Sequence, residues 1–218
     1  MITARPHLPL AFALLLISLP GCSTQFSSER EEAEKPRYSA LTDQKVATMV
    51  WTDWVIRTEY NRIQYDLAEA VQNNLVARSK ATEKKKKPEF SNVEFVPVGS
   101  VVRYQREHPE VQNLTIEQVA PRLGATRVIY IELEEFQTQP PQSVMLLRGS
   151  AKASLRVVEV SAGQAKVAFE ERDIKMIYPT HAPEGVVPSD KMNLRTIYDG
   201  TVKQLATAIG NRFRGEKD

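Results

Sequence analysis

The chain has 218 residues with 29 basic and 27 acidic side chains, and its single cysteine is Cys22. This near-neutral balance argues against nucleic acid as a general partner, because nucleic-acid-binding domains carry a clear excess of Lys and Arg. With one cysteine, the fold has to be held by its hydrophobic core and not by disulfides.

The N-terminus has the order of a secretory signal. Arg5 and His7, with no acid nearby, precede an apolar block over residues 8–19, and small or turn-forming residues follow. The block is too short to cross a membrane, which takes about 20 residues. A lone cysteine directly after such a block needs an explanation, since an odd thiol in an exported protein is paired between chains or chemically used.

The segment Leu19-Pro20-Gly21-Cys22 resembles the lipobox of bacterial lipoproteins. Leu19, Gly21 and Cys22 match that motif, and Pro20 departs from it. The resemblance implies that residues 1–21 are removed and that Cys22 is acylated and attached to a lipid bilayer. Ser23, where an aspartate signals inner-membrane retention, implies the periplasmic face of the outer membrane. The alternative is a secreted protein with an incidental cysteine.

The first half of the mature chain predicts a tether followed by mixed structure. Residues 22–42 are polar and predict a disordered tether, and residues 43–215 predict a single periplasmic domain. Hydrophobic spacing then indicates, in chain order, a strand at 45–51, a helix at 58–78, a strand at 92–98, a helix near 100–107, and a helix that a capping box opens at Thr115 and Gly124 closes.

The second half predicts three strands and a final helix. The strands cover 127–136, 150–160 and 165–179, with a bulge near 171–173 where the apolar set changes parity. The last helix is expected over about 190–213, with Asp190 as its N-cap and Leu194 on its apolar face. The fold class is α+β, or α/β with antiparallel edges: a mixed sheet of about five strands with helices packed on one face.

The stretch QVAPRLGATRVIYIELEEF (118–136) resembles a group of periplasmic lipoproteins. The group includes the curli secretion channel lipoprotein, the lipoprotein activator of penicillin-binding proteins and the N-terminal domain of TolB. The likeness is one of topology, spans about 43–213 and transfers no functional residue. The chain departs from the group at Glu132, where a glycine often interrupts the strand, and it lacks long membrane-spanning hairpins, so pore formation is not expected.

The sequence holds no recognisable catalytic constellation. It has no G-x-S-x-G, no H-E-x-x-H and no phosphate-cradling glycine loop. His108 and His181 lie near prolines in expected loops, so we expect no metal site and no cofactor. Glu132 and Glu134 share one strand face, which is typical of a solvated edge. The lysine run 84–87 is interpreted as a hydrated loop, although it could meet phosphate groups.

Two features are candidates for a partner surface. Trp51 and Trp54 flank a strand end, where indoles contact a partner or cap the core. Two proline-containing loops, 137–149 and 178–190, carry apolar residues: Val144, Met145, Leu146 and Leu147 in the first, and Val186 and Val187 in the second. The alternative for the segment 144–147 is that it begins the next strand.

These features favour a non-enzymatic adapter or assembly factor of the cell envelope, which binds an envelope protein or itself. One alternative is an envelope enzyme or enzyme subunit that acts on cell wall or lipid with Glu132, Glu134 or His181. Another is a carrier of a small ligand or lipid, which would need a large apolar cavity under the sheet. The alternation over 150–160 indicates a packed face instead of such a cavity.

Overall fold

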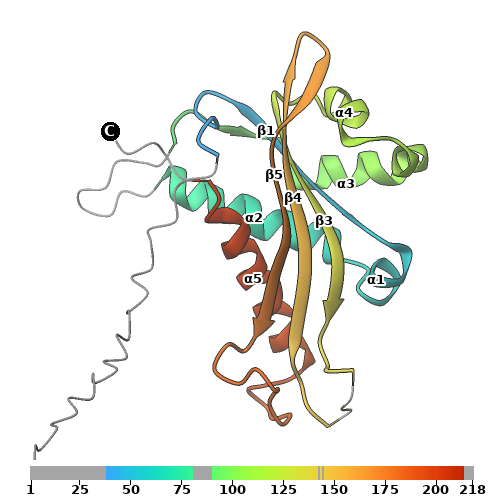
Figure 1. Cartoon of the computed structure of the whole chain (residues 1–218), viewed down its shortest axis with the longest axis vertical. Helices are drawn as coiled ribbons and strands as arrows, with labels where there is room; N and C mark the ends of the chain where they lie inside the picture. The colour runs from blue at the N-terminus through green and yellow to red at the C-terminus, as the bar shows by residue number, and fades with distance from the viewer. Residues whose placement is uncertain (1–37, 81–89, 142, 144, 214–218) are drawn as a thin grey trace, which may run out of the picture. The chain divides into compact units, whose positions relative to one another are not determined.

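The computed structural model describes residues 38–80, 90–141, 143 and 145–213. Its sheet has five strands in the order β2-β1-β3-β4-β5 (Figure 1). β1 pairs in parallel with β2 and β3, whereas β3, β4 and β5 are antiparallel neighbours. The strand bounds are Lys45–Thr52 for β1, Glu94–Phe95 for β2, Arg127–Gln137 for β3, Gly149–Ser161 for β4 and Gln164–Tyr178 for β5. The expected five-stranded mixed sheet is therefore confirmed.

The helices are unequal in length. The longer ones are α2 (Ile63–Ser79), α3 (Val98–Glu107) and α5 (Leu194–Gly210). The shorter ones are the α-helices α1 (Trp54–Glu59) and α4 (Ile116–Val119) and the 3-10 helices η1 (Pro109–Asn113) and η2 (Ala120–Leu123). Among the described residues, no helix is long and apolar enough to cross a membrane.

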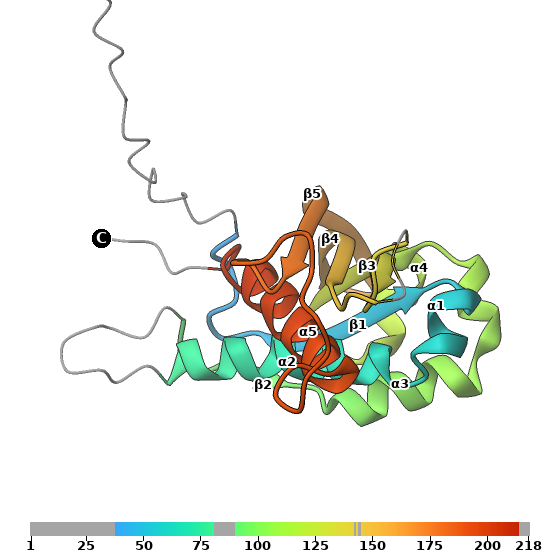
Figure 2. The same cartoon turned by 90° about the horizontal axis from the view of Figure 1, so that it is seen from below.

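The two faces of the sheet are covered differently. α2 and α5 pack together over one face, as Figures 1 and 2 show, and bury the larger core with Ile129, Ile131 and Leu133 of β3. Strand side chains alternate, so Val128 points to the other face, where a smaller core lies under α4, η1 and η2. The short helices cover only one end of that second face and leave the rest open for polar side chains.

The predicted helix over 58–78 is wrong at its start. The chain forms α1 first, because the Asp53 carboxylate accepts a hydrogen bond from the Ile56 N–H at 2.9 Å and caps that helix. α2 then begins at Ile63 and buries the expected stripe, including Leu67, Val71 and Leu75. Trp54 therefore begins a helix instead of ending the strand.

Other helix and strand ends differ from the predicted ones because of local sequence signals. The strand expected over 92–98 is only two residues long, since α3 begins directly after Pro97. Asn193 caps α5, accepting from the Thr196 N–H at 3.0 Å, so Asp190 is not the N-cap. The capping box at Thr115 and the left-handed Gly124, with φ of 62°, are confirmed. The bulge in β5 is confirmed too: Ala153 pairs with Ile174 but Leu155 with Glu171.

The domain begins earlier than expected. Tyr38 and Leu41 are buried, and the Tyr38 ring packs edge-on against Phe213 at 6.1 Å between centroids. The Tyr38 hydroxyl also donates to Glu159 at 3.0 Å. Tyr38 and Leu41 thus belong to the folded core, although the tether was expected to extend to residue 42. Its remaining part, with Cys22, lies outside the described residues.

Candidate functional site

The open part of the second sheet face carries a ladder of alternating charges. Arg156 of β4 lies between two carboxylates: its Nη2 is 3.3 Å from Glu132 Oε2 on β3, and its Nε is 3.4 Å from Glu170 Oε1 on β5. The same guanidinium lies 5.6 Å from the centre of the Tyr130 ring. Three strands are thereby linked across the face by one cation.

A second cation continues the ladder. Lys152 Nζ is 2.8 Å from Glu134 Oε2 and 3.1 Å from Asp173 Oδ1, and Ser154 also donates to Glu134. The hydrogen bonds from Lys152 and then Ser154 lower the pKa of Glu134, and Lys152 likewise lowers the pKa of Asp173. Both carboxylates are therefore held ionised at neutral pH.

This arrangement does not favour acid–base chemistry. A general acid needs a raised pKa, whereas the pKa of Glu134 is lowered and Glu132 is bound to Arg156. Glu132 and Glu134 do share one strand face, as expected, but His181 is exposed in the loop after β5. Within the described ranges, no group of three or more His, Cys, Asp and Glu side chains is arranged to hold a metal ion.

Trp51 lines a small cavity where the open face meets η1 and α4. It is half-buried, pairs in register with Glu132 across β1 and β3, and shares the cavity with Met49 and Tyr130. The volume is about 160 Å³. That is below the roughly 300–1,000 Å³ of typical small-molecule sites, so this cavity does not support the lipid-carrier alternative.

The two proline-containing loops pair with each other. The Leu147 N–H donates to Val186 O at 2.8 Å, and the Val186 N–H donates back to Leu147 O at 2.9 Å. Leu147 is buried, with 3% of its surface exposed, so its side chain does not face a partner. Its neighbour Met145 is 76% exposed.

The two loops lie at the end of the sheet where β5 ends and α5 begins (Figure 1), and these segments carry exposed apolar side chains. We call four of them the loop tip: Met145, Ile177, Val187 and Leu194. Leu194 was expected on the buried face of its helix, but it begins α5 and is exposed at the helix end. Leu146 is half-buried beside Gly185, and Val144 lies outside the described residues.

The remaining candidate, Trp54, is not part of the loop tip. It is 68% exposed at the first position of α1, next to the exposed Val55. The structure thus brings Met145 and Val187 to one end of the sheet and places Trp51 and Trp54 elsewhere. Ile177 was not identified from the sequence as a surface residue. After the bulge, Ile177 has the opposite parity in β5 to Ile174, Met176 and Tyr178, and this alternation is a signal that could have identified it.

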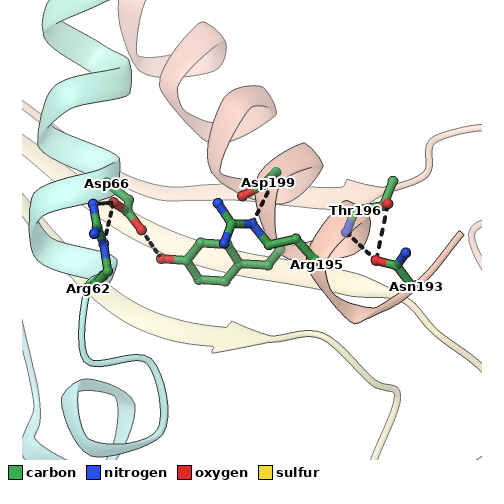
Figure 3. A network of polar contacts seen from close by, with 7 residues as sticks. Arg62, Asp66, Asn193, Arg195, Thr196 and Asp199 are labelled. Atoms are coloured by element: carbon green, nitrogen blue, oxygen red, sulfur yellow. Dashed lines mark hydrogen bonds and ion pairs between the residues drawn. The ribbon is translucent and has the colours of Figure 1, made fainter. Parts of the chain in front are cut away.

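A polar network holds the base of the loop tip. The Tyr198 hydroxyl of α5 donates a hydrogen bond to Asp66 of α2. Asp66 is also bound by Arg62 at 3.2 Å (Figure 3). Burial, followed by the hydrogen bond to Asp66, raises the pKa of Tyr198. The ring also packs against both Tyr60 and Phe136. The helix end that follows the 178–193 loop is therefore fixed to the core.

No protein-family model and no curated protein matches the chain. Solved structures with a similar fold include the PelC dodecamer from Paraburkholderia phytofirmans, at 11% identity and a TM-score of 0.41 over 84% of this chain and 94% of that one. Lipoprotein GNA1162 from Neisseria meningitidis is 12% identical with a TM-score of 0.41 over 75% and 98%. Protein CT253 from Chlamydia trachomatis is 14% identical with a TM-score of 0.33 over 77% and 98%. Likenesses this distant assign neither a family nor a function.

Proposed function

We propose that this protein is a lipid-anchored envelope protein that acts as a non-enzymatic adapter or assembly factor and binds a partner protein through the loop tip. The observation that carries the proposal is the exposure of Met145 and Val187, at 76% and 73%, on two loops that are paired by backbone hydrogen bonds. Exposed apolar side chains on an ordered support are typical of interaction surfaces.

The position of the loop tip supports this proposal. Tyr38, where the described chain enters the domain, contacts Phe213 just after α5, whereas the loop tip adjoins the first residue of α5. The 17 residues of α5 separate these two ends by about 25 Å, at 1.5 Å per residue. The described chain therefore enters the domain at the end opposite to the loop tip.

Photo-crosslinking in living cells tests the partner surface. A photo-crosslinking phenylalanine analogue replaces Met145 or Val187 in the full-length chain, and Gln164, exposed in the β4–β5 turn at the other end of the sheet, is the matched control. We expect one dominant adduct from the two loop positions and none from Gln164. A second copy of this chain in that adduct would identify self-association. Equal adducts from all three positions, or none from the loops, would contradict the proposal.

The anchor is tested separately. Mass spectrometry of the membrane-bound protein should show an acylated Cys22 as the first residue, and the Cys22→Ala variant should leave the membrane fraction. Density separation of the membranes should place the acylated form with the outer membrane, as Ser23 implies. An unmodified, soluble mature protein would contradict the anchor without deciding whether the loop tip binds a partner.

A further inference from the structure

A hollow between α2 and α3 is lined by three arginines. Its volume is about 540 Å³, and its lining consists of Arg62, Tyr65, Gly99, Val102, Arg103 and Arg106. Val102 of α3 and Leu67 of α2 are both buried in the larger core. Arg62 also belongs to the polar network beside the loop tip, but the proposed function does not use the hollow.

The arginines converge because of their helix positions. Gly99, Arg103 and Arg106 are spaced by four and three residues, which puts them on one face of α3. Arg62 approaches from the start of α2, where its guanidinium lies 5.6 Å from the centre of the Tyr65 ring. Guanidinium groups are charged at any physiological pH, so three positive charges line the same hollow.

These charges are only partly compensated. Arg62 forms an ion pair with Asp66 at 3.2 Å. Arg103 and Arg106 are exposed, and neither makes an ion pair in the part of the chain that the structure describes. Like charges that share a concave surface raise its positive potential and attract anions. The space beside Gly99 is open, because a Cβ added there would meet nothing within 4 Å.

We propose that this hollow binds a phosphate group, carried either by a soluble ester or by a phospholipid head group. The planar fork of arginine donates paired hydrogen bonds to phosphate oxygens, and two or three guanidiniums can surround one such group. Val102 and Tyr65 supply an apolar floor and a ring beside the charges, which suits a phosphate attached to a carbon chain.

Calorimetric titration of the full-length protein in a neutral detergent tests the proposal. Glycerol 1-phosphate and dihexanoyl phosphatidylglycerol are the two probes, and glycerate is the carboxylate control. We expect both phosphates to bind and glycerate to bind at least about tenfold more weakly. A phosphatidylglycerol affinity about tenfold above that of glycerol phosphate would assign the lipid head group, and equal affinities would assign a soluble ester. No binding of either phosphate, or equal binding of glycerate, would overturn the proposal.

Charge-matched variants locate the site. Arg103→Gln and Arg106→Gln should each raise Kd about tenfold, the usual effect of losing one charge-assisted hydrogen bond. Arg195→Gln removes the same charge from a pair with Asp199 on α5 and should leave Kd unchanged. Replacing the lysines at 84–87 by glutamine should also leave Kd unchanged. Loss of binding in that lysine variant, with no effect of the two arginine changes, would overturn the proposal.

Substitutions at Gly99 test the hollow itself. Gly99→Ala adds a methyl group into open space and should keep the affinity. Gly99→Glu places a carboxylate among the arginines and should weaken phosphate binding about tenfold or more, while an acidic residue in the first helical turn favours folding of α3. Unaltered binding in a folded Gly99→Glu variant would overturn the proposal.

Discussion

The hydroxyl of Tyr198 on α5 donates a hydrogen bond to the Asp66 carboxylate on α2, with an oxygen–oxygen distance of 2.9 Å. These residues lie 132 positions apart in the chain. The contact joins the first turns of the two helices that cover the sheet, beside the segment that ends in the loop tip. It therefore couples the stability of the core to the position of the proposed partner surface.

Removing that hydroxyl should destabilise the fold. Tyr198→Phe keeps the ring but leaves a partly buried carboxylate without one of its donors, so we expect a loss of about 1–3 kcal/mol in urea denaturation. Tyr65→Phe is the control, since its hydroxyl donates to Glu69 at the surface and its removal should change stability by less than about 0.5 kcal/mol. Equal losses of stability in Tyr198→Phe and Tyr65→Phe would contradict a stabilising role of the Tyr198–Asp66 hydrogen bond.

Gly149 should not tolerate a side chain. A Cβ there would overlap the hydroxyl oxygen of Thr201, which is fully buried in α5, and would lie 3.2 Å from Ile197. We expect Gly149→Ala to lower the free energy of unfolding by about 1–3 kcal/mol, as overpacked cores do. Gly99→Ala, in open space on a helix, should raise it by about 0.5–1 kcal/mol.

Thermal or urea denaturation of both glycine variants would check this contrast. Adding Thr201→Ala to the Gly149→Ala variant removes the overlapping hydroxyl oxygen and should recover part of the stability. Gly149→Ala at wild-type stability would show that β4 and α5 are not held as closely as the structure indicates.

The charge ladder predicts a specific acid dependence. Lys152 lowers the pKa of both Glu134 and Asp173, so their contribution to stability is present at neutral pH. It is lost as the pH falls through these lowered pKa values, which lie below the ordinary 4.5 of Glu and 3.8 of Asp. Lys152→Gln should flatten the dependence of the unfolding free energy on pH in that acid range. Because the groups are exposed to solvent, 1 M salt should flatten it in the wild type too.

Urea denaturation between pH 2.5 and 6 measures this slope. Lys203→Gln is the control: Lys203 is exposed on α5, outside the ladder, and its loss should leave the slope unchanged. An unaltered slope in Lys152→Gln would show that the ladder contributes no linked stability.

Substitutions of Leu147 and Met145, both in the first loop, should differ in their effect on stability. Leu147→Ala removes a buried side chain and should cost about 2–5 kcal/mol. Met145→Ala changes an exposed side chain and should alter stability by less than about 0.5 kcal/mol while it weakens crosslinking at the loop tip. Loss of the crosslink in Met145→Ala together with a large loss of stability would assign Met145 to packing instead of binding.

Local patterns by themselves determined most of the secondary structure. The alternation in residues 150–160 predicted β4, the change of parity near 171–173 predicted the bulge, and the capping box with Gly124 marked both ends of the α4–η2 segment. These predictions succeeded because each depends on neighbours within about four residues, which is the range of caps, turns and side-chain periodicity. The lipobox is equally local and awaits its test at Cys22.

Only the tertiary structure decided that the first and last described residues meet and what the loops expose. Tyr38 reads as part of a polar tether, yet it packs against Phe213. Leu147 resembles its exposed neighbour Met145 in type, yet it is buried where the first loop pairs with Val186 of the second. Arg62 and Arg106 line one hollow from two helices. Each case depends on contacts between distant segments, and burial at such contacts is a property of the packed fold, which the local order of residues does not encode.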